Sequence, residues 1–156
     1  MRRILYTRPD GGISIIVPVI SRDDIKEFTE ADAEARAWDN SIPAEAINPR
    51  FIEEADVPKE RGFRNAWIAD GAKIKTDMEK ARAIHMDRIR AARNAELVKL
   101  DISQMTAISK SDTIEMTKIE AQKETLRDLP DTFDLTIAKT EGELIELWPP
   151  ELVKTK

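Results

Sequence analysis

The sequence predicts an α+β protein that is mainly helical, and three observations support this. Two short apolar segments on either side of a Pro-Asp-Gly-Gly turn predict an N-terminal β-hairpin within residues 3–20. An uninterrupted stretch with helical periodicity predicts a long helix over about 77–100. A second helical stretch that ends near Pro130 predicts a partner helix, and together the two form a helical hairpin.

The hairpin prediction depends on the turn formed by residues 8–12. Pro9 pre-sets φ, and the Asp-Gly-Gly that follows it tolerates positive φ. Pro18 cannot donate to a strand ladder, so it should end the second strand or mark a sheet edge. Because a single hairpin is only marginally stable in water, we expect a further element or a partner chain to cover it.

The next segment predicts one helix and a connection. Residues 21–24 form a plausible N-cap with acidic residues in the first turn, and apolar side chains recur at helical spacing as far as Trp38. Residues 43–50, with two prolines, indicate a connection. Residues 51–54 indicate a short strand or an extended segment.

The long helix is apolar on two sides, which is typical of a helix that lies between other elements. One sector contains Met78, Met86, Ile89, Leu97 and Leu100. A second sector of smaller residues contains Ala81, Ile84, Ala91, Ala95 and Val98. The alanines would allow a neighbouring helix to approach closely.

Capping signals predict the remaining helix boundaries. Residues 101–104 resemble a capping box that opens a new helix, and residues 109–112 restart a helix that runs to about Asp128, so the second arm of the hairpin is expected over 102–128. Another capping box at residues 140–143 opens a short C-terminal helix that reaches Trp148. We therefore divide the chain into a β-hairpin and helix region, residues 1–56, and a helical region, residues 57–156.

The composition argues against most chemistry. The net charge of −5 argues against a general nucleic-acid binder, and the absence of cysteine excludes disulfides and thiolate sites. His85 is the only histidine, its neighbours have the wrong spacing for a metal site, and no glycine loop could hold phosphate. We expect no catalytic residues, no cofactor and no metal, hence no enzyme; a two-carboxylate hydrolase is the formal alternative.

The N-terminus begins like a signal peptide, but Thr7, Arg8 and Pro9 interrupt its apolar run at once. No apolar stretch is long enough to cross a bilayer. The expectation is a soluble protein made in a cytoplasm, without a membrane partner.

Two aromatic clusters are candidate contact sites. In residues 61–67, Phe63 and Trp67 are spaced i,i+4 beside Arg64, so they either plug the base of the helical hairpin or anchor an interface. We prefer packing for this cluster. For Leu147 and Trp148, followed by two prolines, we prefer docking on another chain. The candidate partner-binding residues are therefore Phe63, Arg64, Trp67, Leu147 and Trp148.

Residues 57–67 (VPKERGFRNAW), followed by residues 77–85 and 88–93, resemble small proteins encoded in tailed bacteriophages and prophages. Residues 123–130 (KETLRDLP) and Trp148-Pro149 resemble the ending of phage tail assembly chaperones and tail-fibre assembly proteins. The resemblance covers about residues 56–150. The chain departs from the chaperone pattern at residues 101–102, where a tryptophan is usual, and in its N-terminal hairpin.

The resemblance implies a bacteriophage tail-associated protein that acts by protein–protein contact. It would be either a structural component of the virion or an assembly factor for the tail or tail fibre. Its partners would be other phage tail or virion proteins, in an oligomer or hetero-complex, located in the virion or in the host cytoplasm during assembly. The alternative is a host-directed regulator that binds nucleic acid, although nucleic acid is not the partner that the composition favours.

Overall fold

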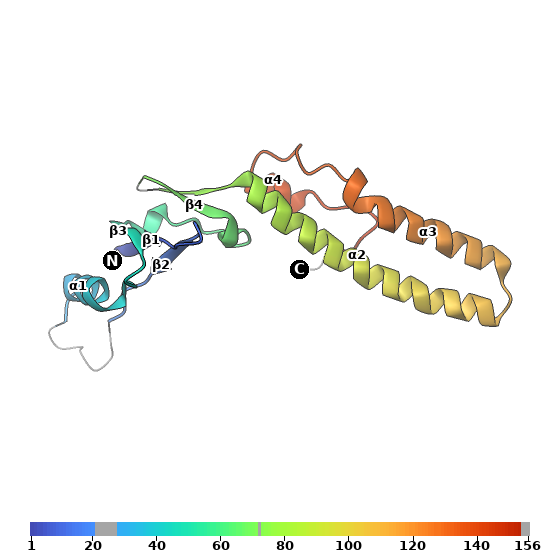
Figure 1. The fold of residues 1–156 in the computed structure, drawn as a ribbon, viewed down its shortest axis with the longest axis horizontal. Coiled ribbons are helices and arrows are strands. Elements are labelled where there is room, and N and C mark those ends of the chain that lie inside the picture. The colour runs from blue at the N-terminus through green and yellow to red at the C-terminus, as the bar shows by residue number, and fades with distance from the viewer. Residues whose placement is uncertain (21–27, 72, 154–156) are drawn as a thin grey trace. The chain divides into compact units, whose positions relative to one another are not determined.

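The structure, a computed structural model, describes residues 1–20, 28–71 and 73–153. It confirms the α+β prediction, with 52% of residues in helices and 16% in strands. The chain forms two compact units, Met1–Asp77 and Met78 onward, which Figure 1 shows in blue to green and in green to red. Because contacts concentrate within each unit, each has its own core and is described by itself.

An antiparallel sheet forms the base of the N-terminal unit. Its strands are β1 (Arg3–Thr7), β2 (Ile13–Ile16) and β3 (Ile47–Ile52), in the order β2-β1-β3. The predicted hairpin is thus confirmed, and it is covered on its β1 side by β3. Strand β3 begins four residues before the predicted extended segment, within the expected connection. Its breakers, Asn48 with φ of 49° and Pro49, are accommodated because β3 is an edge strand whose register shifts there.

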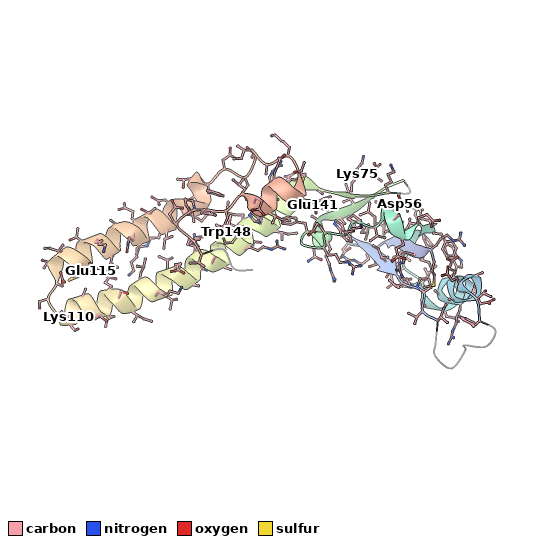
Figure 2. All side chains as sticks on the ribbon, turned by 180° about the vertical axis from the view of Figure 1, so that it is seen from behind. Asp56, Lys75, Lys110, Glu115, Glu141 and Trp148 are labelled. Carbon is pink, nitrogen blue, oxygen red and sulfur yellow. The ribbon has the colours of Figure 1, made fainter. Side chains whose placement is uncertain are left out.

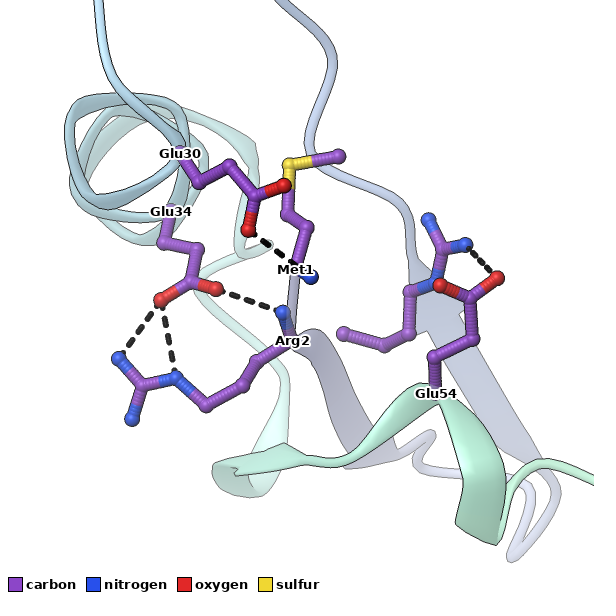
Figure 3. A network of polar contacts seen from close by, with 6 residues as sticks. Met1, Arg2, Glu30, Glu34 and Glu54 are labelled. Atoms are coloured by element: carbon purple, nitrogen blue, oxygen red, sulfur yellow. Dashed lines mark hydrogen bonds and ion pairs between the residues drawn. The ribbon is translucent and has the colours of Figure 1, made fainter.

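Helix α1 (Glu30–Ser41) contacts β3, where the Trp38 ring stacks on the Phe51 ring with the centroids 4.8 Å apart. It begins at a capping box in which Thr29 accepts from the Asp32 N–H and the Asp32 carboxylate accepts from the Thr29 N–H. The cap predicted at residues 21–24 lies outside the described residues. The N-terminus ties α1 down: the amino group of Met1 lies 3.1 Å from Glu30, and Arg2 binds Glu34 (Figure 3).

A second hairpin, which the sequence did not predict, completes this unit. The 3-10 turns η2 (Glu54–Asp56) and η3 (Arg64–Ala66) lead into β4 (Trp67–Asp70) and β5 (Lys73–Thr76), which pair antiparallel. Trp67 packs in the sheet core, whose other buried members are Leu5, Ile13, Ile52 and Ile74. The proposed position of Trp67 at the base of the helical hairpin is therefore wrong. Residues 57–77 belong with the N-terminal unit, so the division falls after Asp77 rather than after residue 56.

The second unit is built on a helical hairpin. Helix α2 (Met78–Ser109) and helix α3 (Thr113–Thr132) run antiparallel, and Lys110 and Glu115 mark the turn between them in Figure 2. The predicted cap of α3 is confirmed, since the Asp112 carboxylate accepts from the Glu115 N–H at 3.0 Å. The predicted break at residues 101–104 is wrong, because α2 continues without interruption to Ser109.

The C-terminal segment, residues 133–153, returns along α2. Helix α4 (Glu141–Glu146) starts at the predicted Thr140 cap and ends two residues before Trp148. Arg82 on α2 donates to the carbonyl oxygens of Leu135, at 3.1 Å, and Ala138, at 2.7 Å. The described helices include none that is both long and apolar enough to cross a membrane.

Candidate functional site

A groove of about 810 Å³ opens in the N-terminal unit. One wall is the edge of the sheet, formed by residues 12–15 and Val17. Most of the other lining residues come from the segment 54–67, which includes the 3-10 turns and the first residue of β4. The Arg61–Trp67 motif therefore helps to form this groove.

The groove follows the free edge of β2. Side chains alternate between the two faces of a strand, so consecutive residues can line one hollow only where it runs along the strand edge. Residues 12–15 do so here. Strand β2 is the last strand of its sheet, and no other strand in the described ranges pairs with its outer edge.

Two residues of β2 direct their backbone groups toward that edge. The Arg8 N–H donates to the Gly12 carbonyl at 2.7 Å, so Arg8 and Gly12 are a hydrogen-bonded pair. Residue pairs along an antiparallel ladder alternate between hydrogen-bonded and non-hydrogen-bonded pairs. In the β1–β2 register, Ile13 and Ile15 therefore belong to the non-hydrogen-bonded pairs. Their N–H and C=O groups therefore point away from β1 and can accept a further strand.

Cationic side chains dominate the groove. Five of its lining residues are basic: Arg3, Arg8, Lys59, Arg61 and Arg64. Glu54 is the only acidic one, and Arg3 binds its carboxylate at 2.6 Å (Figure 3). The side chains of Lys59, Arg61 and Arg64 are exposed, with no ion pair to another described residue. A positive field is thus concentrated on one side of a unit that belongs to an acidic chain.

The hairpin turn fixes the position of Arg8 at one end of the groove. Asp10 accepts from the Gly12 N–H at 2.8 Å and from Arg8 Nε at 3.1 Å. The Gly12 hydrogen bond, followed by the Arg8 guanidinium, lowers the pKa of the Asp10 carboxyl. The Arg8 guanidinium lies over Gly12 in the space that a Cβ would occupy. Arg8 is therefore pre-positioned by local bonds rather than by a groove contact.

The groove brings together only some of the predicted contact residues. Arg64 is exposed on its rim and Trp67 lines it, but the Trp67 side chain is only 6% exposed and belongs to the core. Its indole Nε1 has no hydrogen-bond partner in the described part of the chain. Phe63 is fully buried. Trp67 and Phe63 therefore support the groove from within and do not project as anchors.

Leu147 and Trp148 belong to the second unit, in which Figure 2 labels Trp148. His85 Nε2 donates to the Leu147 carbonyl at 2.9 Å, and its ring meets the Trp148 indole edge-on at 5.6 Å. The Trp148 Nε1 donates to the Leu152 carbonyl at 3.2 Å. These contacts give both residues a structural role in docking the C-terminal segment on α2.

A second surface lies on α2. Ala91, Ala95, Val98, Ile102 and Met105 follow one another at spacings of four and three residues, so they form one stripe, called here the α2 stripe. Val98, Ile102 and Met105 are 59%, 65% and 68% exposed. Gln104, which binds Glu120 and Lys123 on α3, is two positions from Ile102, or about 200° around the helix. The α2 stripe therefore faces away from α3.

Little of the groove is visible in the sequence, because its basic residues come from three separate segments that meet only in the folded unit. Two signals point to it: the Arg61–Trp67 motif, which supplies Arg64 and Trp67, and Pro18, which predicts the end of the second strand or a sheet edge. Among the described residues, no cluster of three or more histidine and acidic side chains could hold a metal ion.

Comparisons of the chain with protein families, with curated protein sequences and with solved structures find no match.

Proposed function

We propose that this chain is a bacteriophage tail-associated protein that acts by protein–protein contact. It serves either as a structural component of the virion or as an assembly factor for the tail or tail fibre. The observation that carries the proposal is the groove: residues 57–67, the first of the segments that resemble phage proteins, contribute to the lining of a cationic groove beside an open strand edge.

The groove is suited to contact rather than to catalysis. Its one acidic side chain, Glu54, is held by Arg3, and its one hydroxyl side chain, Ser14, has no histidine or second carboxylate beside it in the lining. His85, the only histidine of the chain, lies in the other unit and is 3% exposed. An open edge and fixed cations instead provide hydrogen bonds and charge for a bound chain.

The α2 stripe supports the proposal of an oligomer or hetero-complex. Large apolar side chains that recur with heptad spacing on a helix are usually covered by another helix. Here the stripe extends over about 21 Å of α2, from Ala91 to Met105 at about 1.5 Å per residue. Burial of this stripe against a virion protein or a second copy would stabilise the assembled state.

Nucleic acid is the second candidate partner, and the groove cations favour it. Single-stranded binding sites, however, combine positive charge with aromatic faces on which bases stack. Trp67 is the only aromatic residue in the lining, and it is buried in the core. The groove therefore offers charge without a stacking surface, which suits a protein segment better than a nucleic acid.

Mass spectrometry of purified particles from the encoding phage, and of its tail assembly intermediates, tests the proposed function. A structural component is expected in mature particles at a fixed ratio to other tail proteins. An assembly factor is expected in the intermediates and absent from mature particles. Absence from both fractions, with the known tail proteins detected as a control, would contradict the proposal.

A further inference from the structure

We propose that the groove binds an extended acidic segment of a partner protein, which adds to β2 as a fourth strand of the sheet. This inference rests on the proposed function, because it names the chemistry of the partner for the same groove.

The edge of β2 provides main-chain hydrogen bonds to an extended chain and to little else. The N–H and C=O groups of Ile13 and Ile15 point toward the groove, as derived above from the ladder alternation. They repeat every second residue, at a spacing of about 6.6 Å, which matches the repeat of another β-strand. Peptides that add to a sheet edge obtain their affinity from such bonds.

The side chains around the edge select for negative charge. Lys59, Arg61 and Arg64 line the same groove as β2 and are exposed, and Arg8 lies in the hairpin turn that precedes β2. A strand placed along β2 would therefore share the groove with these cations. Carboxylates on its outer side would pair with them, whereas a basic segment would be repelled.

The partner segment should also carry apolar side chains. Beyond β2 the chain continues with Val17 and Val19, which are 49% and 71% exposed, on either side of the buried Pro18. Val17 also lines the groove. A segment in which acidic and β-branched residues alternate would bury its apolar side chains here and present its carboxylates to the cations.

The test uses the full chain and a fluorescein-labelled peptide of about nine residues, the upper range of strand length, in which Asp or Glu alternates with Val or Ile. Its binding is measured by anisotropy and compared with a basic peptide of the same pattern. Two further peptides carry N-methyl groups on the odd or on the even residues, which removes the N–H donors on one edge or on the other. We expect the acidic peptide to bind, and the basic peptide and one of the two N-methylated peptides to bind at least about tenfold more weakly.

Two charge-reversal variants locate the site. Arg61→Glu with Arg64→Glu changes the groove, and Lys110→Glu with Lys118→Glu makes the same change of charge on exposed residues of the helical unit. We expect the groove variant to lose at least about tenfold in affinity and the control to stay within about twofold. In amide NMR spectra, the bound peptide should shift the signals of Ile13 and Ile15 and leave that of Ile114 unchanged.

Three outcomes would overturn the inference. Equal binding to both charge-reversal variants would place the peptide elsewhere, and undiminished binding of two peptides that are N-methylated on the odd and on the even residues would exclude strand addition. A single-stranded oligonucleotide of equal charge that binds more tightly than the acidic peptide would assign the groove to nucleic acid. The proposed function fails separately: if the chain is absent from particles and intermediates while the peptide still binds, the groove stands and the phage assignment does not.

Discussion

His85 Nε2 donates a hydrogen bond to the carbonyl oxygen of Leu147 at 2.9 Å, and this bond joins α2 to the segment that follows α4. The same imidazole lies edge-on to the Trp148 indole. The bond fixes the tautomer, because a carbonyl can only accept and the proton must therefore be on Nε2. The only histidine of the chain thus acts as a clamp for the C-terminal segment.

Replacing His85 by Ala should release this clamp. The hydrogen bond and the ring contact are lost together, so we expect the free energy of unfolding to fall by about 1–3 kcal/mol, measured by urea denaturation. Limited proteolysis should cut residues 133–153 faster. Trp148→Phe keeps an aromatic ring and loses only the bond to Leu152, so it should cost less. Unchanged stability in His85→Ala would contradict the structural role of Trp148.

Replacing Trp67 by Ala should destabilise the N-terminal unit strongly. Trp67 fills the core between Leu5 and Ile74, and large-to-small changes of this kind cost about 3–5 kcal/mol. Arg64→Ala, three positions earlier in the same motif, changes an exposed side chain and should stay within about 0.5 kcal/mol. Hydrogen exchange of β1 amides reports on this unit directly. Comparable exchange rates in Trp67→Ala and Arg64→Ala would contradict a core position for Trp67.

Local signals in the sequence were sufficient for the elements that local bonds define. The Asp10-Gly11-Gly12 turn, the Asp112 cap and the Thr140 cap all occur as predicted, because each is decided by a few neighbouring residues. The second hairpin was missed because its strands have four residues each and their apolar residues make contact with distant strands. Such strands depend on tertiary packing, which a short pattern does not reveal.

The false helix break at Asp101 has a similar cause. A capping-box pattern at residues 101–104 would favour a new helix in isolation. In the structure, Asp101 and Gln104 instead bind the ammonium group of Lys123, whose side chain is buried against them from α3. Because Asp101 and Gln104 bond across the hairpin to Lys123, they are not needed to cap a new helix, and α2 continues through them. The cationic groove could not be predicted for the same reason, since its charges meet only after folding.

We expect the bonds of Lys123 to contribute to the stability of the helical hairpin. Lys123→Ala removes both the charge and the buried stem, so we expect a loss of about 1–3 kcal/mol in unfolding free energy. Lys123→Met keeps a stem of similar length and should cost clearly less, because replacing a buried cation by an apolar side chain can be nearly neutral. Thermal denaturation followed by circular dichroism at 222 nm provides the comparison. A Met variant as unstable as the Ala variant would show that charge is decisive.

The stability of the N-terminal unit should fall at acid pH. The Arg2 guanidinium donates to the Glu34 carboxylate at 2.9 and 2.7 Å, and the Arg2 backbone N–H donates to it at 2.6 Å; the guanidinium bonds, followed by the backbone bond, lower the pKa of the Glu34 carboxyl. A lowered folded-state pKa means that the stabilisation is complete above the ordinary glutamate value of about 4.3. It is lost as pH falls through the lowered value, where the carboxylate takes up a proton.

Denaturation of the wild type and of Glu34→Gln across the range from neutral to acid pH measures this effect. We expect Glu34→Gln to be less stable at neutral pH and to show a smaller decrease with acid, because the titrating group is gone. Glu141→Gln serves as a control in the other unit. A wild-type decrease no steeper than that of Glu34→Gln would mean that this pair does not contribute to acid sensitivity.

We expect substitutions in the α2 stripe to change the association of the chain without changing its folding stability. Ile102 on the stripe and Ile137 in the C-terminal segment are 65% and 62% exposed, so a change to Glu at either position places a charge at a similar degree of exposure. Both variants should keep their unfolding free energy within about 0.5 kcal/mol of the wild type under dilute conditions. If the stripe is covered in the assembled state, Ile102→Glu should shift the chain toward monomer, since a carboxylate cannot be buried there without a partner. Light scattering over a range of protein concentrations distinguishes the two variants. A wild-type chain that stays monomeric at every concentration would exclude self-association, and the α2 stripe would then require a different protein as its partner.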